Sequence, residues 1–350
     1  MTNNIDKIAY SILELALISE GNTTRDTFKN SLALAQKAES FGYNRFWLAE
    51  HHNAISIACS ATAVLIGYIA EGTKKIRVGS GGIMLPNHAS LIVAEQFGTL
   101  GTLYPNRIDL GLGRAPGTDQ VTAHAIRSDR MTAVYQFPEE VRKIQQYFSK
   151  ENAGAKVRAN VAEGVDVPIY ILGSSTDSAH LAAKKGLPYA FASHFATTHL
   201  MEALAIYRNE FQPSAYLKEP YCMAGVNVII GETAEAAERM YTTLIRAIIG
   251  LLTNQRGYLQ APTALTKDLK EVLNHPAVRQ MLKYAFVGNK GKVKEQTADF
   301  LAKTGVNELI AVTNIYDAQD RINSYRYFAE IMGEINGQKL QTMDFYKASV

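Results

Sequence analysis

The chain has little cysteine: only Cys59 and Cys222 occur among its 350 residues. Two cysteines cannot build the disulfide framework of a small secreted protein, and such a low content fits the reducing cytoplasm. No run of lysine or arginine stands out, and the formal net charge at pH 7 is only +3. A nucleic acid is therefore not expected as a partner.

Long hydrophobic runs are also missing. The most apolar stretch, residues 55–70, is interrupted by serine, threonine and glycine, and it is too short to span a bilayer. The first ten residues, MTNNIDKIAY, carry charges where a signal peptide needs an apolar core. We expect a soluble, cytoplasmic protein with no membrane partner.

Several familiar catalytic motifs are missing as well. The sequence has no Walker loop, no GxSxG, no HExxH and no paired Cys-x-x-Cys. What it has is the composition of an ordinary globular enzyme, with 47% hydrophobic and 20% charged residues. A chain of this length can bury a large core.

About eight short apolar segments alternate with segments of helical periodicity. The predicted strands are residues 8–13, 45–50, 76–79, 108–112, 168–173, 189–192, 223–230 and 308–313. This pattern predicts an α/β fold, a (β/α)8 TIM barrel with insertions. A doubly wound open sheet is the main alternative, but it requires a Gly-rich loop after the first strand. Residues 14–24 contain only Gly21.

No change of composition marks a linker, so residues 1–350 are expected to form a single domain. Residues 253–286, between the predicted strands 7 and 8, interrupt the alternation with a polar, partly helical insertion. It follows a helix at the face where barrel enzymes build their sites. We interpret it as a candidate mobile lid.

Residues 76–117 are predicted to form a β-α-β unit, with Gly81-Gly82 after its first strand and Arg114 after its second. Sites in parallel α/β folds lie at these carboxyl ends. Glycines there allow the close approach of a flat ligand, or simply a tight turn. The guanidinium of Arg114 suits a phosphate or a carboxylate, or a surface ion pair.

Glu50-His51-His52 follows the second predicted strand. Adjacent strand residues point to opposite sides, so only one of the two histidines can face the barrel mouth. Metal-dependent barrels present alternate residues, so no metal site is expected. The histidine facing the mouth could act as a base or as a hydrogen-bond partner for a cofactor, or it could be structural.

Ser174-Ser175 lies between a strand and a helix, where hydroxyls and free N–H groups can bind an anion or merely cap the helix. These serines and Arg114 converge only if the fourth and fifth strands are neighbours, as they are in a barrel. The combination predicts a ligand that carries a phosphate.

Five segments, WLAEHH, VGSGGIMLPNHASLIVAEQF, RIDLGLGRAPG, ILGSS and GLPYAFASHF, together resemble the luciferase-like, flavin-dependent monooxygenase family. The resemblance covers nearly the whole chain in the same order. It implies a (β/α)8 barrel that uses reduced FMN and O2, through a flavin C4a-hydroperoxide, to oxygenate a small organic substrate. It also implies a homodimer and a separate NAD(P)H:flavin reductase.

The resemblance assigns roles to single residues. It implies that His51 is the active-site histidine beside the flavin. From the alternation of side chains along a strand, we expect His52 to point the other way and to pack against the barrel wall or the following helix. It implies that Gly81-Gly82 backs the isoalloxazine ring, often through a non-prolyl cis peptide. Arg114 matches the arginine that holds the FMN phosphate.

Gly173, Ser174 and Ser175 match the family's phosphate loop after the fifth strand, and residues 253–286 match its mobile loop. Gly113 stands where the light-emitting subunit has a reactive cysteine, which argues against bioluminescence. Two alternatives stay open: an oxidoreductase that transfers hydride through a flavin or deazaflavin, and a non-catalytic flavin-binding protein.

Overall fold

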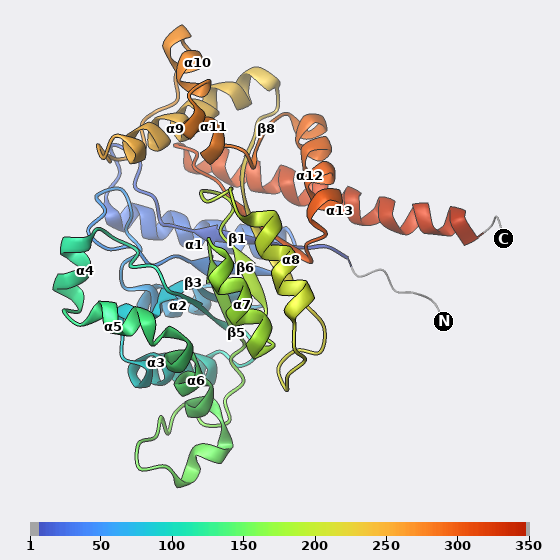
Figure 1. The fold of residues 1–350 in the computed structure, drawn as a ribbon. Helices are drawn as coiled ribbons and strands as arrows, with labels where there is room; N and C mark the ends of the chain where they lie inside the picture. Colours follow the sequence, from blue (N-terminus) through green and yellow to red (C-terminus); the bar gives the residue numbers. More distant parts are fainter. Residues whose placement is uncertain (1–6, 348–350) are drawn as a thin grey trace.

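The computed structural model describes residues 7–347, with the side chains of Arg130 and residues 338–347 outside that description (Figure 1). A closed barrel of eight parallel strands forms its centre. These strands are β1 (Ala9–Glu14), β2 (Arg45–Leu48), β3 (Arg77–Met84), β4 (Ile108–Gly113), β5 (Ile169–Gly173), β6 (Tyr189–Phe191), β7 (Cys222–Ile230) and β9 (Glu308–Val312). They pair in this order, and β9 returns to β1 to close the barrel. The predicted (β/α)8 TIM barrel and its eight strands are confirmed.

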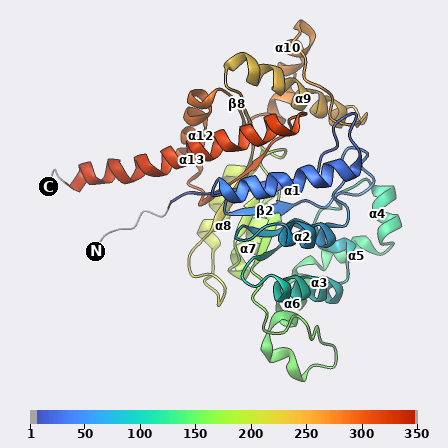
Figure 2. The ribbon, with the colours of Figure 1, turned by 180° about the vertical axis from the view of Figure 1, so that it is seen from behind.

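Helices surround the barrel. The long ones outside the insertion are α1 (Thr24–Ser40), α2 (Thr62–Glu71), α3 (Ser90–Leu103), α6 (Phe137–Phe148), α7 (Thr176–Lys185), α8 (Leu200–Glu210), α12 (Lys290–Thr304) and α13 (Ala318–Lys347). Short elements are η1 (Leu85–Asn87), α4 (Gln120–Ile126), α5 (Arg130–Tyr135) and η2 (Lys150–Gly154). Figure 2 shows α1 and α13 side by side, with α13 continuing past the barrel. No helix in the described part of the chain is long and apolar enough to cross a membrane.

Local signals in the sequence explain where α1 begins and ends. The hydroxyl of Thr23 accepts a hydrogen bond from the N–H of Asp26, whose carboxylate accepts one from the N–H of Thr23. This capping box satisfies two N–H groups that a helix start leaves open. After the last turn, Gly42 adopts φ of 82°, a left-handed conformation that glycine takes without steric cost.

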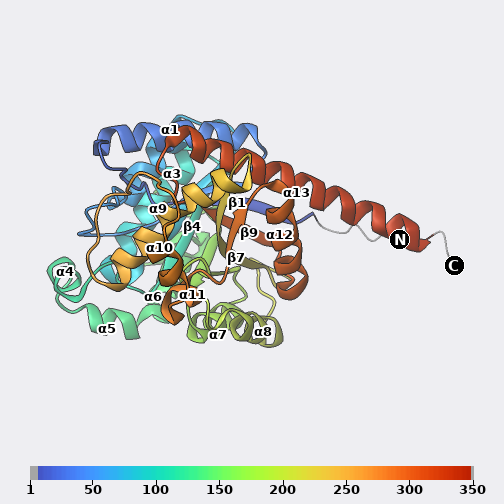
Figure 3. The ribbon, with the colours of Figure 1, turned by 90° about the horizontal axis from the view of Figure 1, so that it is seen from above.

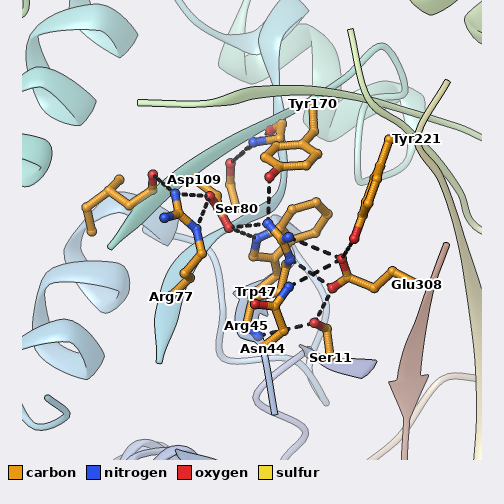
Figure 4. Close-up of polar contacts among 12 residues, drawn as sticks. Ser11, Asn44, Arg45, Trp47, Arg77, Ser80, Asp109, Tyr170, Tyr221 and Glu308 are labelled. Carbon is orange, nitrogen blue, oxygen red and sulfur yellow. Dashed lines mark hydrogen bonds and ion pairs between the residues drawn. The ribbon is translucent and has the colours of Figure 1, made fainter. Parts of the chain in front are cut away.

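The barrel interior is divided into an apolar and a polar part. The inward-facing apolar side chains include Leu13, Trp47, Tyr170, Met223 and Ile310. A charged network lies at the amino end of the barrel, where the strands begin (Figure 4). There Arg45 forms ion pairs with Asp109, at 2.7 Å, and with Glu308, at 2.8 Å.

This network stabilises the amino end of the barrel and is not the candidate active site. Arg45 also donates to the Tyr170 hydroxyl, and the indole N–H of Trp47 donates to Asp109 (Figure 4). Buried charges are tolerated only when they are paired and hydrogen-bonded in this way. Ion pairs at the amino end of a barrel serve stability, because the chemistry of barrel enzymes occurs at the other end.

A further long helix, α9 (Ala234–Leu252), follows β7. The insertion after it contains α10 (Lys267–Leu273), α11 (Pro276–Met281) and the start of the strand β8 (Ala285–Gly288). β8 was not predicted. It pairs outside the barrel with the second half of β7, from Asn227 to Ile230. Figure 1 shows α9, α10 and α11 gathered at one end of the molecule, and in Figure 3, seen from above, they lie in front of the barrel.

Candidate active site

The predicted site residues gather at the carboxyl end of the barrel, which we call the mouth. His51 follows β2, Gly81 and Gly82 lie in β3, Arg114 follows β4, and Ser174 follows β5. These four strands are consecutive neighbours and all run parallel. The fold therefore brings the predicted residues to one side of one mouth, as the barrel prediction requires.

Arg114 reaches the first turn of α7. Its Nη2 lies 2.8 Å from Oδ2 of Asp177, and the two side chains are 43% and 65% exposed. β4 and β5 pair directly, so the ends of both strands approach the start of this helix. We call Arg114 together with residues 174–177 the anion site.

The serines of the anion site do not cap the helix with their side chains. Ser175 is the N-cap residue of α7, but within the described chain its hydroxyl makes no capping hydrogen bond. The first N–H groups of a helix carry partial positive charge and have no intrahelical partner. This helix start therefore offers what a phosphate needs, and the geometry fits the group that the motifs predict.

Gly173 has a packing role. A Cβ at this position would lie 1.8 Å from the hydroxyl oxygen of Ser178, so glycine is needed to bring α7 against the end of β5. The Ser178 hydroxyl in turn donates to the carbonyl oxygen of Ser175 at 2.8 Å. Contact of Gly173, Ser174 and Ser175 with a cofactor stays a prediction.

The glycine pair lies inside β3 rather than after it. The peptide bond between Gly81 and Gly82 is cis, as the resemblance implied. The predicted strand end at Gly79 is wrong, because β3 resumes pairing with β4 at Ile83 after a register shift and continues to Met84.

Packing explains why both positions are glycine. A Cβ on Gly81 would lie 2.7 Å from the side chain of Leu13 and 3.0 Å from Cβ of Trp47. A Cβ on Gly82 would lie 2.7 Å from the carbonyl oxygen of Gly111. Gly81 is partly exposed, so its bare backbone is available to a flat ligand above the apolar interior.

His51 lies near groups from two other segments, the insertion and the loop after β4. Burial lowers the pKa of its imidazole below the ordinary value, and the positive charge of Arg256 in the insertion lowers it further. The backbone of Gly117, after β4, acts in the opposite direction. The balance keeps His51 neutral at neutral pH, so the ring can donate one hydrogen bond and accept another.

His52 corrects a prediction. It was expected to pack against the barrel wall or a helix, but its Nε2 lies 2.8 Å from Oε1 of Glu50. Glu50 also binds Nε2 of His88 at 2.9 Å and the N–H of Met84 at 2.9 Å. Residues two apart on an extended chain share a side, so Glu50 and His52 meet while His51 points elsewhere.

Glu50 is the centre of this polar cluster. Burial would raise its pKa, but hydrogen bonds from His52 and His88 outweigh burial and lower the pKa to about 2. The carboxylate is therefore charged at all ordinary pH values. Over the described residues, no group of three histidine, cysteine, aspartate or glutamate side chains could hold a metal ion.

Sequence reasoning missed two polar residues at the mouth. His194 follows β6 and Asn314 follows β9, on the two sides of β7. Nδ1 of His194 and Oδ1 of Asn314 are buried without a hydrogen-bond partner in the part of the chain described. The sequence could have placed His194 at the mouth, because it stands in GLPYAFASHF just after a predicted strand. No motif in the sequence points to Asn314.

Comparisons with known proteins agree with this geometry. The family model for luciferase-like monooxygenases matches residues 10–308. A luciferase-like monooxygenase of Escherichia coli strain K12 is 43% identical over 94% of this chain and 98% of its own. The N-acetyl-S-alkylcysteine monooxygenase of Bacillus subtilis strain 168 is 32% identical over 92% of this chain and 98% of its own.

Solved structures give the same result. The crystal structure of apo-MsnO8 is 32% identical and covers 93% of this chain and 98% of its own, with a TM-score of 0.83. Two more distant barrels, at 16% and 15% identity, are an oxygenating Baeyer-Villiger component in complex with FMN and an F420-dependent secondary alcohol dehydrogenase. Their TM-scores of 0.70 and 0.67 show the shared fold alone. The chain belongs to the luciferase-like monooxygenase family.

Proposed function

We propose that this protein is an FMN-dependent monooxygenase that uses reduced FMN and O2 to oxygenate a small organic substrate. The observation that carries the proposal is the anion site, where Arg114 meets the first turn of α7 at the mouth of a luciferase-like barrel. The terminal phosphate of FMN has the charge and the oxygen geometry that a guanidinium and a helix start bind.

Each residue then has a definite task. Arg114 and the N–H groups at the start of α7 hold the phosphate, and Gly81 leaves room for the ring plane. Reduced flavin supplies the electrons that activate O2. His51, neutral and partly buried, holds or moves a proton at its ring nitrogens beside the reacting centre.

Asp177 affects how tightly the anion site can bind a phosphate. Its carboxylate pairs with Arg114, and a phosphate bound at the same place competes with it for the guanidinium. Both side chains are largely exposed, so breaking the pair costs little. We expect Asp177 to moderate FMN affinity, which suits a protein that exchanges its flavin with a separate NAD(P)H:flavin reductase.

The insertion at residues 253–286 is proposed to close over the mouth and keep water from the reacting groups. The charge of Arg256 reaches His51, and the N–H of Glu20, in the loop after β1, donates to the carbonyl oxygen of Leu259 at 2.8 Å. Val278 and Leu282 are buried against α9, so we limit the mobile part to the residues before α11.

A homodimer is proposed from exposed apolar side chains on two neighbouring helices. Val64 and Tyr68 of α2 are 72% and 41% exposed, and Ile92 of α3 is 47% exposed. α2 and α3 lie on the same side of the barrel (Figure 2). Light scattering should give twice the chain mass, and Val64→Glu should shift it towards the monomer. A monomeric parent protein would contradict this assembly.

The cytoplasmic location stays a prediction.

The test uses the protein with reduced FMN and 18O-labelled O2. We expect flavin-dependent O2 uptake and one labelled oxygen in the product, with N-acetyl-S-alkylcysteines as the first substrates because a 32% identical relative is named for them. Hydride transfer through a flavin or F420 is the second candidate, because a dehydrogenase shares the fold. Anaerobic turnover without labelled product would support that candidate and contradict the monooxygenase.

A further inference from the structure

His194 approaches His51 from across the mouth. It follows β6, and β6 lies four strands from β2 in a barrel of eight, so the carboxyl ends of these two strands face each other. Burial, and next the charge of His51, lower the pKa of His194 to about 4. The proposed flavin site occupies β3 to β5, between these two imidazoles.

β7 holds His194 in place through the backbone. Nδ2 of Asn227 donates to the carbonyl oxygen of His194 at 2.6 Å, and the hydroxyl of Ser193 donates to the carbonyl oxygen of Gly225 at 2.7 Å. A Cβ on Gly225 would lie 2.5 Å from Nδ1 of His194, so the ring lies directly against this glycine. The ring of Phe195 packs edge-on at 4.9 Å.

These contacts favour one tautomer of the ring. Nδ1 faces Gly225, is buried, and has no partner within the described residues, although the residue as a whole is only partly buried. A buried N–H without an acceptor is rarer and costlier than a bare acceptor atom. The proton therefore belongs on Nε2, and burial keeps the ring neutral at neutral pH.

Resting on the proposed function, we propose that His194 is a fixed, neutral hydrogen-bond donor whose Nε2–H binds a carbonyl oxygen of the flavin ring. The two ends of the cofactor are then recognised by different chemistry. Arg114 binds the charged phosphate, and His194 binds an uncharged carbonyl oxygen, for which a neutral donor is sufficient.

The tautomer is tested first, in the ligand-free protein. Uniform 15N labelling and long-range proton–nitrogen correlation spectra distinguish the two neutral tautomers from the imidazolium, and the spectrum of His194→Gln assigns the signal. We expect a neutral ring with its proton on Nε2 at neutral pH. A proton on Nδ1, or an imidazolium at neutral pH, overturns the inference.

The donor is tested next, with riboflavin and FMN as probes. Both carry the ring carbonyls and only FMN carries the phosphate. His194→Phe removes the donor and should weaken both probes by the same factor, about two- to tenfold. His194→Gln, whose side-chain amide keeps a donor at a similar distance from the backbone, should restore most of the affinity. Arg114→Ala should weaken FMN alone.

The outcomes separate the two claims. If the parent protein binds flavin but folded His194→Phe binds riboflavin equally well, the inference about His194 fails and the proposed function survives. If both probes bind as expected but only hydride transfer occurs, the proposed function fails and His194 keeps its role. A parent protein that binds neither probe contradicts both.

Discussion

At the scale of single residues, the anion site depends on two charges of opposite sign. Arg114→Ala removes a charge-assisted contact with the phosphate, and we expect about a tenfold loss of FMN affinity. The side chain of Arg114 is 43% exposed, so water weakens its contact with the phosphate, and the loss of affinity lies at the lower end of the range for charge-assisted hydrogen bonds. Asp177→Asn removes a competing carboxylate and should tighten FMN binding severalfold. Titration calorimetry with FMN and riboflavin measures both changes, and equal effects on the two ligands would refute the assignment.

Adjacent histidines should fail differently when they are replaced. His51→Ala removes a neutral imidazole from the mouth, so we expect a loss of about 10²–10⁴-fold in product formation with the fold retained. His52→Ala removes a hydrogen bond to the buried Glu50 and should lower thermal stability more than the turnover of folded protein. Product formed per flavin oxidised, measured beside the melting temperature, separates the two roles. Parent-level oxygenation by His51→Ala would make that residue purely structural.

Glu50 predicts a specific dependence of stability on pH. Its pKa is about 2 in the folded protein and near 4.5 when unfolded, so the folded state binds fewer protons between these values. The resulting stabilisation, about 3 kcal/mol, is complete above the unfolded pKa and is lost as pH falls towards 2. Denaturant unfolding of the parent protein and of Glu50→Gln, compared between about pH 5 and pH 3, should show a steeper loss in the parent. Parallel curves would contradict this role of Glu50.

The residues found from sequence are those with local signatures. Arg114 and Ser174 stand directly after apolar segments, so their place at strand ends follows once the strands are recognised. The contact between Glu50 and His88 could not be found in this way, because the two residues lie 38 positions apart and meet through the pairing of β2 with β3. The sequence places His194 just after a predicted strand, but its contact with Gly225 on the neighbouring strand follows only from the fold.

At the scale of elements, short irregular pieces escaped prediction for physical reasons. β8 has four residues, AFVG, too few for any periodicity, and it exists because β7 extends beyond the barrel and offers an edge. The continuation of β3 past Gly82 depends on renewed pairing with β4, which is not a property of its own sequence.

Shortening the insertion tests whether it acts as a lid. Replacing residues 254–258 by a shorter Gly-Ser link removes exposed chain near His51, including Arg256. We expect unchanged thermal stability and a larger share of reduced flavin diverted to hydrogen peroxide, because water reaches the reacting groups. As a control, deletion of Lys156 and Val157, exposed in the loop that leads to the amino end of β5, should leave the coupling unchanged. Unchanged coupling in the 254–258 variant, or an unfolded variant, would contradict the lid.

At the scale of the whole molecule, the barrel separates stability from function. The charged network around Arg45 and Glu308 closes the amino end, and the buried Nδ1 of His194 and Oδ1 of Asn314, which have no partner among the described residues, lie at the mouth. Between them, Trp47 is fully buried under Gly81 and is the single tryptophan of the chain. A flavin that stacks on Gly81 must therefore lie beside this indole.

The binding of flavin above Gly81 is tested by the fluorescence of Trp47 during an anaerobic titration with reduced FMN, repeated with oxidised FMN. A bound isoalloxazine ring accepts excitation energy from the nearby indole. We therefore predict that FMN quenches the fluorescence of Trp47 and that the quenching saturates. Arg114→Ala should shift the FMN titration about tenfold to higher concentration and leave riboflavin almost unchanged. If saturating FMN leaves the emission of Trp47 unchanged, no flavin binds above Gly81 and the proposed site is wrong.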